Sequence, residues 1–192
     1  MADLRERKKA KTRAAIQSEA LRLFREKGYG ATTVEEIIEA AEVSESTFYR
    51  YFPTKADVVL TDDYDPLIVE AFMAQPPGRD CLSAMREAFR SIFSTMSEDE
   101  IAESQERFGL ILSEPELRSS LLDGLVGTLQ MLLEAVAKRS GRPTSDMDVR
   151  ALTGAVAGAA MVVMLDMVDN PSVNWLESLD QVLAQLEAGF TI

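Results

Sequence analysis

The spacing of its apolar residues constrains this chain most, because it follows the period of an α-helix over almost the whole length. Ile16, Ala20 and Leu23, for example, recur at intervals of four and three residues, which places them on one helix face. The two-residue alternation of a half-buried strand is nearly absent. The sequence therefore predicts an all-α fold of about nine helices.

Glycines, prolines and capping residues mark where the predicted helices begin and end. Gly28 is suited to end the first helix, because glycine readily takes the left-handed conformation that follows many helices. Thr32 or Thr33 can cap the second helix together with a glutamate three residues on, and Ser44 and Thr54 can cap the next two. The expected helices cover residues 10–27, a short segment from 34, then 45–51, 55–74 with a bend near Pro66, 80–96, 98–112, 115–138, 146–168 and 174–189.

The first three segments have the arrangement of a helix-turn-helix. Two short helices are joined by a three-residue turn at 42–44, and a longer helix precedes them. The second short helix, 45–51, is seven residues long. At about 10 Å it can enter the major groove of DNA, which is about 12 Å wide. Three short amphipathic helices are also often a plain bundle, so the pattern alone leaves that alternative open.

Residues 31–55, with the sequence ATTVEEIIEAAEVSESTFYRYFPTK, closely resemble the DNA-binding signature of the TetR family of repressors. The resemblance runs from about Thr12 to Leu60. It implies a three-helix DNA-binding domain over residues 1–54 and a larger helical-bundle domain for ligand binding and dimerisation over residues 55–192. It also implies core roles for Phe48 and Phe52. The DNA contacts it implies are Thr33, Ser44, Ser46, Thr47, Tyr49, Arg50, Tyr51 and Lys55.

Charge bears on how strongly such a domain would bind DNA. Residues 1–60 carry 11 basic and 10 acidic residues, whereas residues 61–192 carry 9 and 22, so the net charge of −12 resides in the second part. Glu42 adds a negative charge where glycine is frequent in the family's turn. A basic arm near the N-terminus is suited to contact phosphates or the minor groove, or is a frayed terminus. The basic arm consists of Arg5, Arg7, Lys8, Lys9, Lys11 and Arg13.

The last two predicted helices have the composition of a subunit interface. Gly154 and Gly158 lie four residues apart, on one helix face, and their small size lets two helix backbones approach closely. The resemblance implies that these helices pair with those of a second subunit as a four-helix bundle. A core within one chain is the alternative. The expected dimer interface consists of Gly154, Gly158, Met161, Leu165, Leu179, Leu183 and Leu186.

The central part of the chain is rich in aromatic residues and methionine, which favours an adaptable, lipophilic ligand cavity. Most of these residues also fit an ordinary hydrophobic core. Residues 58–66 and 110–118 are similar to regulators related to the mycofactocin regulator, a subgroup associated with acyl-CoA-like or other lipophilic effectors. The expected effector-binding residues are Tyr64, Phe72, Phe89, Phe93, Phe108, Met131 and Met161.

Composition argues against other classes of function. The chain has no histidine, the commonest general base and zinc ligand, so we expect no catalytic residue, metal or cofactor. The single cysteine, Cys81, cannot form an internal disulfide and is expected to be a buried, inert thiol in a reducing cytoplasm. No signal peptide is expected, because the first five residues begin no apolar segment. The longest uncharged run, 151–165, is shorter than the ~20 residues that span a membrane.

The sequence thus predicts a cytoplasmic, homodimeric repressor that binds a palindromic operator on double-stranded DNA and is released by a small lipophilic effector. Its two recognition helices would lie about one DNA turn apart, ~34–36 Å. The main alternative is a helical ligand-binding module that does not bind DNA.

Overall fold

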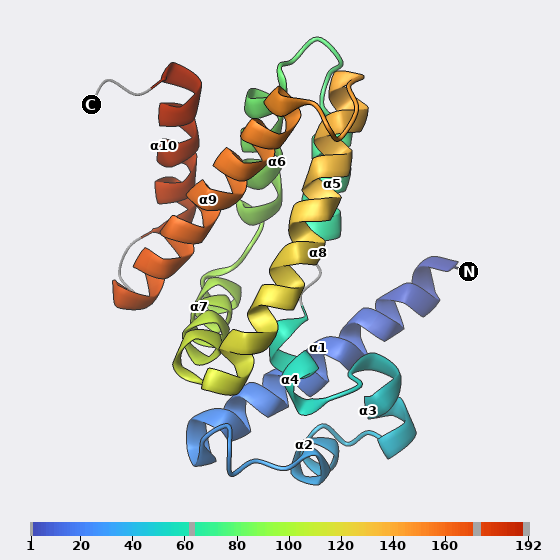
Figure 1. The fold of residues 1–192 in the computed structure, drawn as a ribbon. Helices are drawn as coiled ribbons and strands as arrows, with labels where there is room; N and C mark the ends of the chain where they lie inside the picture. The colour runs from blue at the N-terminus through green and yellow to red at the C-terminus, as the bar shows by residue number, and fades with distance from the viewer. Residues whose placement is uncertain (1, 62–63, 171–173, 190–192) are drawn as a thin grey trace. The chain divides into compact units, whose positions relative to one another are not determined.

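A computed structural model describes residues 2–61, 64–170 and 174–189. Every regular element in these ranges is an α-helix, which confirms the predicted fold class (Figure 1). The helices in the described ranges are α1 (Ala2–Lys27), α2 (Val34–Ala40), α3 (Glu45–Tyr51), α4 (Lys55–Leu60), α5 (Tyr64–Ala74), α6 (Cys81–Phe93), α7 (Glu98–Ser113), α8 (Pro115–Ser140), α9 (Met147–Asp169) and α10 (Trp175–Ala188).

Two of the predicted helices differ most from the structure, while the helix predicted over 80–96 is α6 and ends three residues early. α1 begins at Ala2 rather than at residue 10, because residues 2–9 are mostly alanine, leucine, arginine, glutamate and lysine, which favour helix. The single helix predicted over residues 55–74 is instead α4 and α5, and Thr61 ends α4 in an extended conformation. Pro66 does not bend a helix, since it lies in the first turn of α5, where its missing N–H costs no helical hydrogen bond.

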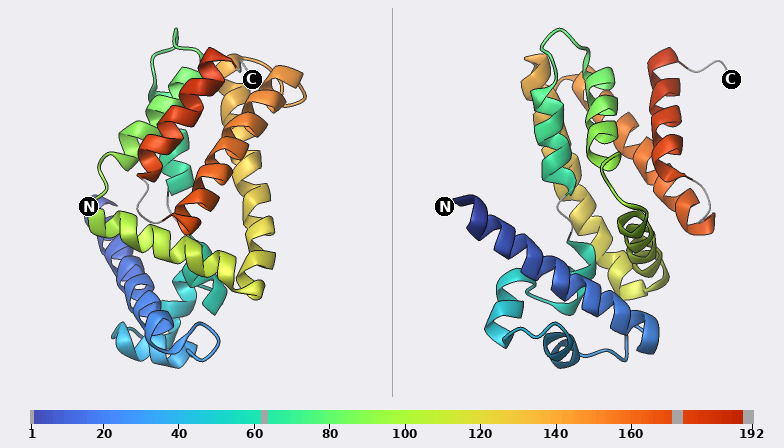
Figure 2. Two further views of the ribbon diagram at one scale, coloured as in Figure 1. Left: turned by 90° about the vertical axis from the view of Figure 1, so that its left-hand side faces the viewer. Right: turned by 180° about the vertical axis from the view of Figure 1, so that it is seen from behind.

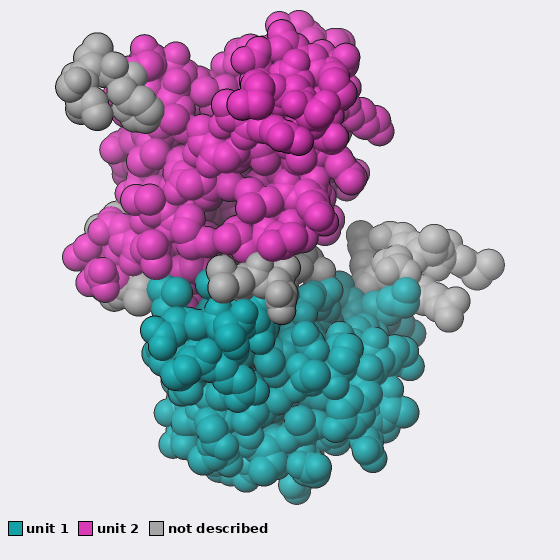
Figure 3. Space-filling view, viewed as in Figure 1, with its two compact units in different colours: residues 1–62, 110–121 teal, residues 63–109, 122–192 magenta. Residues whose placement is uncertain are grey.

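By packing, the chain divides into two compact units, which Figure 3 colours separately. Unit 1 contains residues 1–62 and 110–121, and unit 2 contains residues 63–109 and 122–192. The boundary between the units comes after the end of α4, because α4 packs against α1 and so belongs to unit 1. The predicted division of function at residues 54 and 55 stays a prediction.

The core of unit 1 forms around the apolar stripe of α1. Ile16 and Ala20 are completely buried, as are Ile37 of α2 and Phe48 and Phe52 at α3. Isolated helices of six or seven residues are unstable in water. These buried side chains, rather than intrinsic helix propensity, therefore hold α2 and α3 in place.

Side-chain caps set where the short helices of unit 1 begin. Thr33 Oγ1 accepts a hydrogen bond from the backbone N–H of Glu36 (3.2 Å), and the carboxylate of Glu36 accepts one from the N–H of Thr33 (3.0 Å). Thr54 and Asp57 form the same reciprocal pair at the start of α4. The predicted cap at Thr54 is confirmed. Of the two threonines predicted as alternative caps of α2, Thr33 rather than Thr32 is the cap.

Unit 2 is organised around α6, which packs against both α5 and α10, while α10 also packs against α9 (Figure 2). α6 is strongly amphipathic, so one of its faces is buried in this core and the opposite face carries charge. The buried side chains of α6 are Ala84, Met85, Ala88, Phe89 and Phe93.

Two helices of unusual apolarity run through the second part of the chain. By length and composition alone, α8 and residues 147–166 of α9 pass the test for a membrane-crossing helix, a test that core helices of a folded domain also pass. Only 22% of the apolar window of α9 is buried within the single chain. Much of the apolar surface of α9 is therefore exposed in the single chain. The predicted absence of a membrane partner stays a prediction.

Candidate nucleic-acid interface and ligand site

Hydroxyl groups gather where α3 begins. The hydroxyl of Ser44, the N-cap, accepts from the backbone N–H of Thr47 (3.2 Å). The same oxygen lies 3.1 Å from Ser46 Oγ and 2.8 Å from Thr47 Oγ1. Ser44 and Ser46 are exposed and Thr47 is half-buried. These short side chains let a phosphate or a base edge approach the backbone closely.

The outer face of α3 carries the larger side chains that were predicted to contact DNA. Tyr49 is 46% exposed although its ring packs edge-on against buried Phe48 (5.3 Å between centroids). The guanidinium of exposed Arg50 lies 5.2 Å from the centroid of the half-buried Tyr51 ring. α3 therefore has a buried phenylalanine face and an outward face of hydroxyl, phenol and guanidinium groups.

Lys55, the first residue of α4, has a different environment. Its ammonium donates to the carbonyl oxygens of Tyr29 (2.8 Å) and Thr32 (3.1 Å). It also lies 4.2 Å from the centroid of the Tyr29 ring. The amine that was predicted to contact DNA thus ties the segment between α1 and α2 to the start of α4.

Glu42 occupies the turn before α3 in a conformation that favours glycine. Its φ of +52° makes it the one non-glycine residue with positive φ in the part of the chain described. The left-handed region is unfavourable for a residue with a Cβ. The frequent glycine of this turn is therefore replaced here by a residue that is both strained and negatively charged.

The basic arm divides into exposed and packed residues. Lys8, Lys9 and Lys11 are exposed on α1. The guanidinium of Arg13 instead lies over the ring of Phe52, 5.8 Å from its centroid, and Arg13 is only partly exposed. The side chains of Arg5 and Arg7 lie outside the described residues. Three lysines are thus presented to solvent, and Arg13 covers the core beneath α3.

Aromatic residues of three helices gather in unit 2. The ring of Phe93 lies 5.5 Å from that of Tyr64 and 6.0 Å from that of Phe89, centroid to centroid. It also packs edge-on against Trp175 of α10 at 4.5 Å. We call these four residues the aromatic cluster. It brings together three of the predicted effector-binding residues.

Trp175 was missed by the sequence analysis. Its signal in the sequence is that it is the only tryptophan in the chain and directly follows Asn174, which caps α10. Tryptophan side chains bury a large area and dominate the energetics of cores and interfaces.

The other predicted effector-binding residues do not join the aromatic cluster through any ring contact among the described residues. The ring of Phe72 is completely buried and lies 5.2 Å from the guanidinium of Arg139. Phe108 is buried in α7, while Met131 and Met161 are half-buried in α8 and α9.

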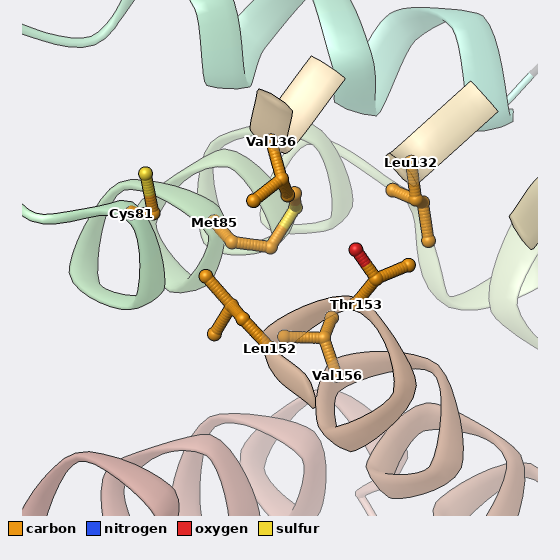
Figure 4. Close-up of a pocket in the computed structure, with 7 residues that line it drawn as sticks. All are labelled: Cys81, Met85, Leu132, Val136, Leu152, Thr153 and Val156. Carbon is orange, nitrogen blue, oxygen red and sulfur yellow. The ribbon is translucent and has the colours of Figure 1, made fainter. Parts of the chain in front are cut away.

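A narrow apolar gap lies between α6, α8 and α9 (Figure 4). None of the predicted effector-binding residues lines it, and it is too narrow to admit even a water molecule. Cys81, at its edge, is partly exposed rather than fully buried as predicted, and its partial burial raises the pKa of the thiol, which favours the protonated form. The residues that line the gap are Cys81, Met85, Leu132, Val136, Leu152, Thr153 and Val156.

Family models match both parts of the chain. Residues 16–61 match bacterial regulatory proteins of the tetR family, and residues 79–191 match the MftR C-terminal domain. The second match covers more than half of the chain. The chain belongs to the TetR family. The predicted family is confirmed, and the protein is a transcriptional regulator with an N-terminal DNA-binding domain.

Individual relatives agree with this assignment. The regulator is 41% identical over 100 residues to the transcriptional regulator TcmR of Streptomyces glaucescens, a match that covers 51% of the chain but only 44% of TcmR. It is 26% identical over 190 residues to a protein named as a mycofactocin biosynthesis regulator, MftR, of Mycobacterium tuberculosis, with 95% of the chain and 93% of MftR covered.

Solved structures share the fold of this TetR-family regulator. A TetR-family regulator from Syntrophomonas wolfei has a TM-score of 0.66 at 21% identity, covering 95% of this chain and 98% of its own. The repressor FadR of Thermus thermophilus, solved with lauroyl-CoA, has a TM-score of 0.57 at 23% identity, covering 94% of this chain and 95% of its own.

The structure separates the predicted dimer residues of the TetR-family regulator into two groups. Gly154, Gly158 and Leu165 of α9 are exposed, and Met161 is half-buried. Leu179 and Leu183 are 3% and 0% exposed within the single chain. Both lie on α10, which packs against α6 and α9, so they are core residues within the single chain. Their predicted place in the dimer interface stays a prediction. Leu186 is half-buried.

Proposed function

We propose that this TetR-family regulator is a homodimeric repressor that leaves a palindromic operator when an uncharged lipophilic effector binds. The observation that carries the proposal is the two-faced α3, with Phe48 buried on one side and Arg50 exposed on the other. A helix held rigidly by its inner face can present its outer face to base edges in the major groove. No catalytic role is part of the proposal, and its proposed location is the cytoplasm.

The proposed DNA contacts are divided by chemistry. The hydroxyls at the start of α3 and the exposed Thr33 suit phosphate oxygens, which fix the register of the protein on the duplex. The Arg50 guanidinium suits the edge of a guanine, and the phenols of Tyr49 and Tyr51 suit phosphates. The proposed contacts are Thr33, Ser44, Ser46, Thr47, Tyr49, Arg50 and Tyr51. Lys55 is set apart from them, because its ammonium already donates to the carbonyl oxygens of Tyr29 and Thr32.

The proposed dimer uses the exposed apolar face of α9. Val162 is 64% exposed and Leu165 is 43% exposed, in line with Gly158 on the same helix. A contiguous exposed apolar face on a single chain favours association. A second copy of the chain is the proposed cover, because a palindromic operator requires two recognition helices related by a twofold axis.

The proposed effector is lipophilic because the core of unit 2 consists mainly of aromatic and aliphatic side chains. FadR of Thermus thermophilus, which shares this fold, was solved with lauroyl-CoA. An effector releases the operator only if it binds the DNA-incompetent conformation more tightly than the competent one. A ligand that saturates the protein without changing its operator affinity contradicts this part of the proposal.

The test is selection of bound sequences from a randomised duplex pool, followed by titration of the selected duplex against salt. We expect an enriched inverted repeat whose affinity falls steeply as salt rises, since released counterions dominate such binding. Arg50→Ala is the matched variant, because Arg50 is exposed and its loss leaves the core intact. If no sequence is enriched at about 50 mM salt after bound ligand has been stripped, the helical ligand-binding module is the correct alternative.

A further inference from the structure

The aromatic cluster holds a buried hydrogen-bond donor without a partner. Trp175 is only 9% exposed, and no residue that the structure describes accepts a hydrogen bond from its indole Nε1. A buried tryptophan normally finds an acceptor. Leaving such a donor unpaired is unfavourable, so this N–H favours binding of a molecule that supplies an oxygen.

The aromatic rings around Trp175 indicate which kind of ligand scaffold would pack there. Phe93 packs edge-on against the indole, and Phe89 stacks on Phe93 with their planes 10° apart. Tyr64 approaches Phe93 from the start of α5. A ligand that reaches the indole N–H must therefore pack against aromatic faces, which suits an apolar, preferably flat, molecule.

The charged residues of α6 and α10 indicate whether the oxygen-bearing group of the ligand is charged or neutral. Arg86 donates to both carboxylate oxygens of Asp180 (2.7 Å each) and to Glu187 (2.9 Å). Arg90 donates to Asp180 (2.6 Å) and to Glu87 (3.4 Å). Both cations that α6 directs at α10 are thus already paired, and α10 itself carries acidic residues but no lysine or arginine. A carboxylate beside Trp175 would be repelled, whereas an uncharged oxygen would not.

We propose that the aromatic cluster binds the effector of this regulator, and that Trp175 Nε1 donates to an uncharged carbonyl oxygen on an apolar aromatic molecule. The effector class is thus neutral aromatic carbonyl compounds rather than fatty or aromatic acids. Because the indole N–H is buried, the ligand can reach it only when Trp175 and Phe93 move apart. Ligand binding would thus stabilise a second arrangement of α6 and α10. The proposal rests on the proposed function, since it names the effector of that regulator.

The single tryptophan allows a direct test. In ¹⁵N-labelled protein, Trp175 gives the one indole ¹H–¹⁵N signal of the chain. The protein is titrated with 2-acetylnaphthalene, with 2-ethylnaphthalene, which lacks the oxygen, and with 2-naphthoate, which is charged. We expect the ketone to move the indole proton downfield and to bind about three- to tenfold more tightly than the ethyl compound, as one added hydrogen bond predicts. The naphthoate is expected to bind most weakly.

Trp175→Phe is the matched variant, because it keeps an aromatic ring and removes the donor. By calorimetry, we expect it to reduce the ketone's affinity to that of the ethyl compound and to leave the ethyl compound's affinity unchanged. Equal binding of ketone and ethyl compound to the natural protein, preference for the naphthoate, or no response of the indole to either neutral compound overturns the proposal. Selection from the duplex pool reports DNA binding independently, so failure of the regulator and failure of this site are distinguishable.

Discussion

The ammonium of Lys55 lies over the ring of Tyr29 and donates to the carbonyl oxygens of Tyr29 and Thr32. Three favourable contacts within unit 1 thus hold the amine that the family resemblance assigns to DNA. Because carbonyls between α1 and α2 accept from a side chain of α4, Lys55 fixes the path of the chain that leads into α2.

This geometry predicts that Lys55→Met acts on stability more than on phosphate contacts. We expect the variant to lose about 1–3 kcal/mol of unfolding free energy, since two carbonyls lose a charged donor. Operator affinity should fall, but the slope of log affinity against log salt should stay unchanged. Arg50→Ala should instead keep its stability and lose about 1–3 kcal/mol of preference for the base pair that Arg50 contacts. A reduced slope with full stability in Lys55→Met would restore the direct DNA contact.

Tyr29 itself predicts a dependence of stability on alkaline pH. Its hydroxyl is buried, with no partner among the described residues, and its burial, aided by the charges of Glu116 and Glu114, raises the pKa of Tyr29 to about 12. In the unfolded chain the phenol titrates near about 10. The folded protein therefore holds this proton more tightly, and the stability so gained is complete below pH ~10 and is lost as the pH rises toward ~12.

Tyr29→Phe tests both consequences of that burial. It removes an unpaired buried hydroxyl, so we expect about 1 kcal/mol of added stability at pH 7. It also removes the titration, so its advantage should grow between pH ~10 and ~12. Denaturant unfolding at several pH values measures both. A variant that is less stable at pH 7 would mean that the hydroxyl has an acceptor in solution.

Local chemistry explains which elements could be predicted from the sequence. The bounds of α3 match the prediction residue for residue, because Ser44 caps its start and Pro53 forces Phe52 out of helical geometry. The stripe of Ile16 and Ala20 on α1 is buried as predicted. Each of these features depends on residues within a few positions of one another.

Features that depend on distant neighbours could not be predicted in this way. Leu179 and Leu183 show an apolar stripe, but the stripe does not say whether α6 or a second subunit covers it. The role of Trp175 depends on Phe93, which lies far away in sequence. The end of α4 at Thr61 is set by tertiary contacts, since Gln17 donates to the carbonyl oxygens of Val58 and Thr61.

The left-handed backbone at Glu42 predicts that Glu42→Gly stabilises the protein. Glycine takes a φ of +52° without the clash of a Cβ, which is worth about 1 kcal/mol. Glu42→Ala is the matched control, because it removes the same charge and keeps the strain. Both variants should bind the operator more tightly, since both remove a carboxylate beside phosphate, but Glu42→Gly alone should gain thermal stability. Equal stabilisation by both would show that charge, and not backbone strain, is the cost at this position.

The glycines of α9 provide a test of the proposed dimer. In the single chain a methyl group added to Gly154 or Gly158 meets no atom within 4 Å. Alanine at both positions should therefore favour the helix, by about 0.5–1 kcal/mol each. If α9 approaches its copy closely in the dimer, the added methyl groups meet that copy, and the dissociation constant measured by sedimentation should rise at least tenfold.

Gly124→Ala is the control for this pair, because Gly124 is also exposed on its helix, α8, with no neighbour within 4 Å. It should gain the same helix stability and leave dissociation unchanged. Operator binding should weaken in the α9 double variant only, and it should recover at high protein concentration, because mass action restores the dimer. If the double variant dimerises as tightly as the natural chain, the backbones of two α9 helices do not meet at these glycines. The exposed apolar face of α9 would then pack against something other than the α9 helix of a second subunit.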